Sequence, residues 1–282
     1  MLIFETQLAL IEHLKVNSDP KTTLGFVPTM GALHQGHLSL VEKSLQNNDL
    51  TIVSIFVNPT QFNNPEDLEK YPRNLESDIA KLQNLTDNMI IYAPTVDDIY
   101  EGNTISKSFY FDGLENQMEG KFRPGHFEGV GTIVKRLFEI VNPTNAYFGE
   151  KDFQQLQIIK KLVEKENFSI NIVECTIFRE VNGLAMSSRN ERLSPNDRNA
   201  AAIIYKTLLE VKHKFSSESL SEIALWVNQV FENQPDFKLD YFEIADETTL
   251  LTSETKNPNQ KYRAFIAVFV NNIRLIDTIS LN

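Results

Sequence analysis

The sequence is poor in cysteine, in positive charge and in long apolar runs. Only one of its 282 residues, Cys175, is a cysteine, so an intrachain disulfide is excluded and a reducing compartment is favoured. Lys and Arg number 27 against 38 Asp and Glu, a formal charge of −11, which disfavours nucleic acid and anionic membrane surfaces as partners. Glu5 and Glu12 interrupt the apolar N-terminus, which predicts neither a signal peptide nor a membrane-spanning helix. We expect a cytoplasmic protein that binds no nucleic acid and no membrane.

Short apolar runs alternate with helical patterns through the first part of the chain. The helical patterns place apolar residues three and four positions apart, as one buried helix face requires. This alternation predicts an α/β fold with a parallel sheet. The expected strands are 23–27, 51–57, 89–92, 146–148 and 170–175, and the expected helices are 38–45, 75–85, 133–141 and 156–163.

The texture of the sequence changes after Arg179. Pro195 and Asp197 open a predicted long helix that runs to Lys214, and a second helix is expected over 219–231. Strands are expected near 239–244 and 262–270. At 282 residues the chain is long enough for two packed domains, which we place at 1–176 and at 177–282, the second being a smaller α+β domain.

The most informative segment is VPTMGALHQGHLSLV, residues 27–41. A buried strand ends there in a turn with Gly31 and Gly36 and becomes a helix, whose free N–H groups and partial positive charge suit a phosphate. His34 and His37 stand three apart, so both imidazoles can face one ligand, donate to phosphate oxygens and offset developing charge. The alternative is a pair of ordinary surface histidines, because a bare HxGH motif recurs by chance.

A second motif, GEKD at 149–152, also lies between a predicted strand and a predicted helix. It is therefore expected at the same edge of the sheet as the first motif. Lys151 is a candidate partner for phosphates, and Gln155, one helical turn later, is a candidate for a polar substrate. A solvated helix start is the alternative for this motif.

A third motif, GLAMSSRN at 183–190, is a loop of small residues at the start of the predicted second domain. Arg189 supplies charge, and Ser187 and Ser188 supply donors for the oxygens of a leaving pyrophosphate. An ordinary linker is the alternative, since serine-rich loops are common.

Two further segments carry polar candidates. FVNPTQFNNPEDLEKYPR, 56–73, offers Gln61 and other neutral groups suited to hydroxyls and amides, which indicates the wall of a small-substrate site. GKFRPGHFEGV, 120–130, brings Lys121, Arg123 and His126 ahead of another helix. This second segment is either part of a site or a solvated basic turn.

VPTMGALHQGH, IFVNPTQF, RPGHFEGV, GEKD with Gln155, and GLAMSSRN, in this order, resemble the pantothenate synthetase (pantoate-β-alanine ligase) family of HxGH nucleotidyltransferases. The resemblance is dense from Gly25 to Arg192 and thins to DYFEIAD near Asp240 and RLID near Arg274. It implies a Rossmann-like N-terminal domain that holds ATP and pantoate, a C-terminal lid domain and a homodimer. The implied reaction activates pantoate as an adenylate with ATP and Mg²⁺ and then joins it to β-alanine.

The resemblance also implies roles for individual residues. His37, His34, Lys151 and Arg189 are the expected catalytic residues, with His37 as proton donor, and Gln61 and Gln155 are expected to bind pantoate. A magnesium ligand is expected on the helix containing Asp78, but Ser77 precedes it where a paired acid is expected, so the metal site stays unassigned. The residues expected to meet ATP are Met30, Gly31, Ala32, Leu33, His34, Gln35, Gly36, His37, Gly149, Glu150, Lys151, Asp152, Phe178 through its main chain, Met186, Ser187, Ser188 and Arg189.

Three other functions stay open at this point. A nucleotidylyltransferase with the same HxGH motif stops at a stable dinucleotide-like product instead of releasing AMP with an amide. A nucleotide-binding regulator binds ATP and forms no AMP. A tRNA synthetase is disfavoured because the acidic chain offers no basic face for tRNA.

Overall fold

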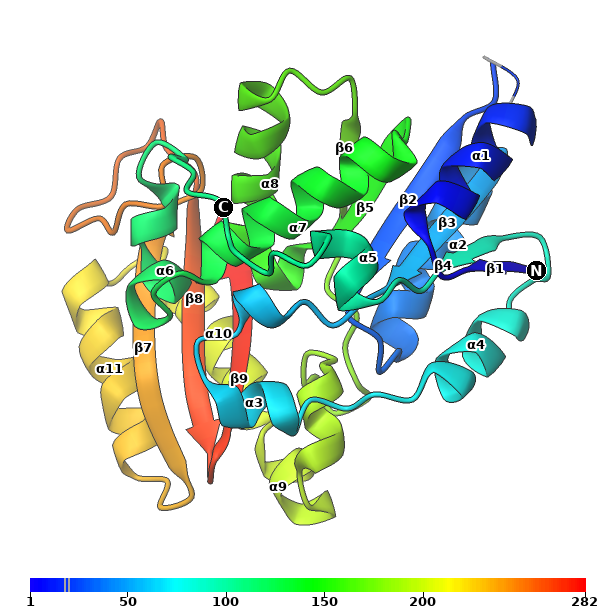
Figure 1. The fold of residues 1–282 in the computed structure, drawn as a ribbon. Coiled ribbons are helices and arrows are strands. Elements are labelled where there is room, and N and C mark those ends of the chain that lie inside the picture. Colours follow the sequence, from blue (N-terminus) through cyan, green and yellow to red (C-terminus); the bar gives the residue numbers. More distant parts are fainter. Residues whose placement is uncertain (18, 20) are drawn as a thin grey trace. The chain divides into compact units, whose positions relative to one another are not determined.

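The computed structural model describes residues 1–17, 19 and 21–282, and these form two compact units (Figure 1). The first unit comprises Met1–Phe111, Arg123–Gly149 and Gln155–Cys175, and the second comprises Asp112–Phe122, Glu150–Gln154 and Thr176–Asn282. The main border lies between Cys175 and Thr176, beside the predicted domain border at 176/177. Two short segments of the second unit come from inside the first predicted domain.

Within the described residues of the first unit, six strands form one parallel sheet, which confirms the predicted Rossmann-like α/β fold. Its central strands are buried on both faces, as a parallel sheet requires; Phe26, Val27, Ile52 and Val53 are fully buried. The strand order is β1-β4-β3-β2-β5-β6. The strands are β1 Leu2–Phe4, β2 Leu24–Thr29, β3 Leu50–Ile55, β4 Ile90–Tyr92, β5 Asn145–Gly149 and β6 Asn171–Cys175.

Helices α2 and α7 cover opposite faces of this sheet. Val27 of β2 packs with Leu38 of α2, whereas the adjacent Phe26 makes an edge contact with Phe138 of α7, with ring centroids 6.4 Å apart. Successive side chains of a strand point to opposite faces, so the two helices lie on opposite sides. The α-helices of the first unit are α1 Gln7–Asn17, α2 Gln35–Asn47, α3 Pro65–Glu69, α4 Leu75–Gln83, α5 Val96–Tyr100, α7 His126–Val141 and most of α8 Phe153–Lys165.

The chain reverses its direction across the sheet at β2. It continues from β2 to β3 and β4 on one side, and after β4 it returns to place β5 on the other side of β2. The carboxyl ends of β2 and β5 therefore flank a topological switch point, the position at which open α/β sheets bind ligands. β2 ends at Thr29 and β5 ends at Gly149, so the first motif and the glycine of the second lie at this edge.

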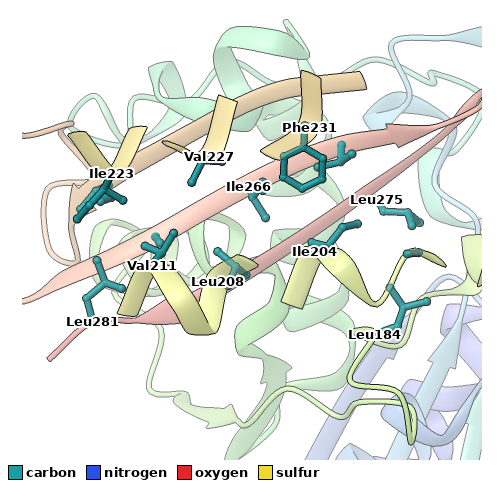
Figure 2. Close-up of a cluster of buried hydrophobic side chains, with 14 of the residues drawn as sticks. Leu184, Ile204, Leu208, Val211, Ile223, Val227, Phe231, Ile266, Leu275 and Leu281 are labelled. Atoms are coloured by element: carbon teal, nitrogen blue, oxygen red, sulfur yellow. The ribbon is translucent and has the colours of Figure 1, made fainter. Parts of the chain in front are cut away.

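The second unit packs helices against a small antiparallel sheet, as predicted for an α+β domain. Figure 2 shows Leu208 of α10 and Val227 of α11 in a buried cluster with Ile266 of β8 and Leu275 of β9. The part of this unit that the structure describes contains the strands β7 Phe237–Asp246, β8 Tyr262–Val270 and β9 Ile273–Ser280 and the helices α6 Met118–Phe122, α9 Pro195–Ala200, α10 Ile203–Lys214 and α11 Leu220–Glu232, with the 3-10 turns η2 Leu114–Asn116, η3 Glu150–Asp152 and η4 Ser188–Arg192.

A charged network joins the early segment 112–122 to the C-terminal sheet inside the second unit. Arg274 of β9 donates to both carboxylate oxygens of Glu119, at 2.9 and 2.8 Å, and to Asp240 at 3.0 Å. The hydroxyl of Tyr241 donates to Glu119 at 2.9 Å, and burial raises the pKa of this phenol. Arg274 and Asp240 thus join parts of the second unit to one another. Both residues lie in the segments where the family resemblance thins.

Two sequence-based expectations for the second unit need correction. The predicted long helix from Pro195 to Lys214 was wrong, because α9 ends at Ala200 and α10 begins at Ile203. Ala201 and Ala202 between them are buried, and hydrogen bonds three residues apart tighten the chain there, so packing overrides helix propensity. Strand β9 was not predicted, and neither were β1 and α1 of the first unit.

None of the described helices combines the length and the apolar character that crossing a membrane requires.

Candidate active site

The two units carry different parts of the predicted site. The first unit carries residues 30–37 with Gly149, Gln61 and Gln155. The second unit carries Glu150, Lys151, Asp152, Phe178, Met186, Ser187, Ser188 and Arg189.

His34 and His37 lie side by side where the loop after β2 becomes α2. Their rings stack with centroids 4.0 Å apart and an interplanar angle of 24°. His34 is the N-cap residue of α2, and its backbone N–H donates to Nδ1 of His37 at 3.4 Å. In neutral His37 this contact favours the tautomer with the ring proton on Nε2, in which that atom is a hydrogen-bond donor.

The loop that precedes the histidines is held by helix α4. Gly31 and Ala32 have φ angles of 78° and 50°, and Asp78 of α4 accepts the backbone N–H groups of Ala32 and Leu33 at 2.8 and 2.7 Å. Lys81 donates to the carbonyl oxygen of Leu33 at 2.7 Å. The N–H groups of Ala32 and Leu33, which were expected to meet ATP, thus already have an internal carboxylate as acceptor.

Gln61 lies against the first motif. It ends the turn η1, Pro59–Gln61, and its Nε2 donates to Sδ of Met30 at 3.0 Å. Its Oε1 accepts Nδ2 of Asn58 at 3.2 Å, and its side chain is mostly buried. The structure therefore brings the residue predicted for pantoate next to the loop predicted for ATP.

Residues at and just before the start of α7 hold the turn η1 in place through contacts with its backbone. Nδ1 of His126 lies 2.8 Å from the carbonyl oxygen of Gln61, and Arg123 donates to the same oxygen at 3.4 Å. A Cβ on Gly129 would stand 2.4 Å from the carbonyl oxygen of Thr60, so only glycine permits this approach. Arg123 and His126 were expected as cationic site candidates, and here they contact backbone; the spacing of RPGHF gave no signal for this positioning role.

The glutamines after GEKD differ in their surroundings. Gln154 is buried and its side chain is committed to backbone: Nε2 donates to Leu114 and Gln117, both at 2.8 Å, and Oε1 accepts the N–H of Glu119. Gln155, the predicted substrate residue, is half-buried on α8.

Within the second unit, Arg263 of β8 fixes the GEKD segment. Its guanidinium donates to Glu150 at 3.4 Å and to Glu247 at 3.0 Å, and lies 4.0 Å from the ring centroid of Phe153. Lys151, half-buried, forms an ion pair with Asp152 at 3.1 Å. The predicted catalytic lysine thus directly follows the anchored Glu150 and is paired with its neighbour Asp152.

The predicted serine loop is a short hairpin rather than a plain linker. The N–H of Met186 donates to the carbonyl oxygen of Phe178 at 3.0 Å, and Ser187 caps η4 by accepting the N–H of Arg189 at 3.2 Å. Ser188 is buried. The main chain of Phe178 and the serines, which were expected to share one ligand, therefore belong to one local structure.

A buried ion pair ties this hairpin to β9. Arg179 donates to both carboxylate oxygens of Asp277, at 2.6 and 3.0 Å, and its guanidinium lies 3.5 Å from the ring centroid of Tyr205. Burial raises the pKa of the Asp277 carboxyl, while the bonds from Arg179 act in the opposite direction.

The expected magnesium ligand on α4 does not fit a metal site. Both oxygens of Asp78 accept backbone N–H groups, and Lys81 stands 3.9 Å from one of them. Across residues 1–17, 19 and 21–282, no cluster of three or more His, Cys, Asp or Glu side chains is arranged to hold an ion.

The chain is similar to known proteins over almost its whole length. The model of the family described as pantoate-beta-alanine ligase matches residues 2–280. The pantothenate synthetases of Flavobacterium psychrophilum and Christiangramia forsetii are 67% and 54% identical to this chain, each over the whole of both chains.

Solved structures are also similar over the whole chain. The crystal structure of pantothenate synthetase from Thermus thermophilus has a TM-score of 0.90 and 37% identity and covers 100% of this chain and 99% of its own. The pantoate-β-alanine ligase from Francisella tularensis, complexed with β-γ ATP and β-alanine, has a TM-score of 0.81 and 36% identity and covers 100% and 98%. From its sequence and its fold alike, the chain belongs to the pantoate-β-alanine ligase family.

Proposed function

We propose that the chain forms its acyl adenylate at the carboxyl edge of the parallel sheet, beside His34 and His37. The reaction of the family joins pantoate to β-alanine and converts ATP to AMP and pyrophosphate through a pantoyl adenylate, in the synthesis of pantothenate. One contact carries the proposal: Gln61 Nε2 lies 3.0 Å from Met30 Sδ, which puts the residue predicted for pantoate beside the loop predicted for ATP.

In the first step a carboxylate oxygen of pantoate attacks the α-phosphorus of ATP, and pyrophosphate leaves. The Nε2–H of His37 donates to a phosphate oxygen, since its Nδ1 already accepts the N–H of His34. His34, stacked on it, supports the same phosphate. Each such donor is worth about a hundredfold in rate, by analogy with the loss of one oxyanion-hole donor.

We assign Lys151 and Arg189 to the phosphates as well, on the strength of the GEKD and GLAMSSRN motifs. Lys151 offsets charge as a compact ammonium, whereas Arg189 offers several donors to the leaving pyrophosphate. The predicted lid, residues 177–282, would exclude water from the reactive adenylate when it closes.

In the second step the amine of β-alanine attacks the acyl adenylate and expels AMP. An alkyl amine has a pKa of roughly 10, so only about one molecule in a thousand is unprotonated at neutral pH. Positioning by Gln61 and Gln155, rather than a strong general base, is proposed to compensate, because effective molarities of well-oriented groups reach on the order of 10⁵ M.

Three further proposals concern the metal ion, the cellular compartment and the oligomeric state. Mg²⁺ is proposed to arrive on the triphosphate, because Mg²⁺ is usually held by substrate phosphates with few protein ligands and Asp78 is occupied. A reducing cytoplasm fits the single buried thiol of Cys175. A homodimer is proposed on the family resemblance, with Ile105 and Tyr110, which are 65% and 68% exposed in one irregular segment, as its candidate contact.

The test is pantoate-dependent exchange of labelled pyrophosphate into ATP. His37→Ala and Lys151→Ala are expected to lose exchange by about a hundredfold or more while keeping their melting temperature. His213→Ala and Lys206→Ala, at exposed positions, serve as matched controls and should exchange like the parent. Parent-like exchange in the His37 or Lys151 variant would reject the assigned role.

A further inference from the structure

The loop between β2 and α2 adopts a conformation that its sequence does not favour. Gly31 and Ala32 are consecutive left-handed residues, with φ angles of 78° and 50°, and this region is unfavourable for alanine. A Cβ on Gly31 would meet a carboxylate oxygen of Asp78 at 3.0 Å. Something outside the loop must therefore stabilise its shape.

Asp78 supplies that stabilisation from helix α4. Its side chain is 2% exposed, and its two oxygens separately accept the N–H groups of Ala32 and Leu33, at 2.8 and 2.7 Å. Lys81, one turn later on the same helix, donates to the carbonyl oxygen of Leu33 at 2.7 Å. Donors and acceptors of the loop are thus bound from one helix, directly before His34.

Successive N–H groups in a left-handed turn form a concave site for an anion. Here that concave site is filled by the protein's own carboxylate. A metal ion at Asp78 would have to face two N–H donors, and the ammonium of Lys81 lies 3.9 Å away. The contacts are those of a carboxylate that binds backbone rather than a cation.

We propose that Asp78 is a positioning residue, assisted by Lys81, that holds the Gly31–Leu33 loop so that His34 and His37 are presented to ATP, and that it is not a magnesium ligand. The inference rests on the proposed role of the two histidines in adenylation. Its structural half, the bracing of the loop, stands independently of that role.

The first test compares Asp78→Asn with Glu76→Gln, an acid-to-amide change at an exposed position in the same helical turn. In Asp78→Asn one loop N–H faces an NH₂ group instead of an oxygen. We expect kcat/KM for ATP to fall about a hundredfold, because small displacements of catalytic groups have effects of that size. Hydrogen exchange of the peptide containing Ala32 and Leu33 should accelerate in Asp78→Asn only.

The second test adds Ala32→Gly, which removes the cost of the left-handed angle. If Asp78 holds this conformation, its loss should cost at least about tenfold less in the Ala32→Gly background than in the parent. If Asp78 binds magnesium, excess Mg²⁺ should restore Asp78→Asn and Ala32→Gly should not. That result, or unchanged exchange at Ala32 and Leu33, would overturn the proposal.

A variant that keeps the buried carboxylate guards against misfolding of Asp78→Asn. Lys81→Met removes the bond to Leu33 and the ammonium 3.9 Å from Asp78, while both bonds from the loop to the carboxylate stay. About a fivefold loss of kcat/KM for ATP is expected from the lost hydrogen bond. Parent-like kinetics together with parent-like hydrogen exchange in Lys81→Met would remove Lys81 from the proposal. If His37→Ala stays active while Asp78→Asn accelerates hydrogen exchange in the loop, the proposed role of the histidines in adenylation is rejected. The proposal that Asp78 stabilises the loop is then retained.

Discussion

Arg179 and Asp277 form a buried ion pair whose two members have different access to water. The side chain of Asp277 is 2% exposed and that of Arg179 is 17% exposed. Removing one partner of such a pair leaves an uncompensated buried charge, which costs about 3–5 kcal/mol. The contribution of this ion pair to stability is therefore best measured by removing Arg179 and following the titration of the Asp277 carboxyl, which remains buried.

Arg179→Met should add a pH dependence to the free energy of unfolding. Without Arg179 the pKa of Asp277, already raised by burial, rises further in the folded protein. The folded state then binds the proton more tightly than the unfolded chain does. Relative to the parent, the contribution of this carboxyl to stability should be highest below about pH 4, the unfolded pKa, and should fall as the pH rises through the folded pKa. Urea unfolding between pH 4 and 7 measures this slope.

The control for this experiment is Asp277→Asn in the Arg179→Met background. It removes the titrating group and should flatten the added slope. A free energy of unfolding that follows the parent at every pH would contradict the assignment.

At the scale of elements, α7 and η1 approach each other so closely that their backbones nearly touch. Gly129 makes this possible, and Asn58 Nδ2 donates to its carbonyl oxygen at 3.2 Å. Asn58 in turn accepts the hydroxyl of Tyr100, whose pKa is raised by burial. Gln61 thus owes its position to a helix more than sixty residues further along the chain.

Gly129→Ala should impair the use of pantoate. The added Cβ would stand 2.4 Å from the carbonyl oxygen of Thr60 and 2.6 Å from Gln61, so η1 must shift. We expect kcat/KM for pantoate to fall about a hundredfold, and we expect a loss of the same size in Gln61→Ala. For Gly131→Ala, on the same helix, the atoms nearest to the added Cβ belong to the rings of Phe109 and Phe111. This control should lower the melting temperature and leave the KM for pantoate unchanged.

Most central elements were predictable because their signal is local. Strands β2 to β6 are short apolar runs, and the stacking of His34 and His37 follows from their three-residue spacing. Strand β9 was not predicted because it buries two polar residues, Asp277 and Thr278, which interrupt its apolar pattern. Their polar atoms are satisfied by Arg179 and by the carbonyl oxygen of Ala264, which are distant in the sequence. The role of Asp78 also depends on distant partners, since the backbone N–H groups that it accepts lie 45 and 46 positions away in the sequence. Local sequence patterns therefore did not predict this role.

At the scale of the whole molecule, the homodimer proposal makes a prediction. The parent should sediment at about twice the 32.3 kDa of one chain. Ile105→Glu with Tyr110→Glu should shift it to the monomer, since burying an unpaired charge in an interface is costly. Leu8→Glu, also at an exposed apolar position, is the control and should leave the mass unchanged. A monomeric parent would refute the proposal.

The second unit is discontinuous, and this limits how the chain can be recombined with its relatives. A fragment that begins at Thr176 leaves behind Glu119, the partner of Arg274 and Tyr241, and Glu150, a partner of Arg263. In a chimaera with a single crossover at that point, Glu119 and Glu150 would come from one parent, and their partners in the C-terminal sheet would come from the other. Exchange of the unit therefore has to include three stretches of chain, 112–122, 150–154 and 176–282.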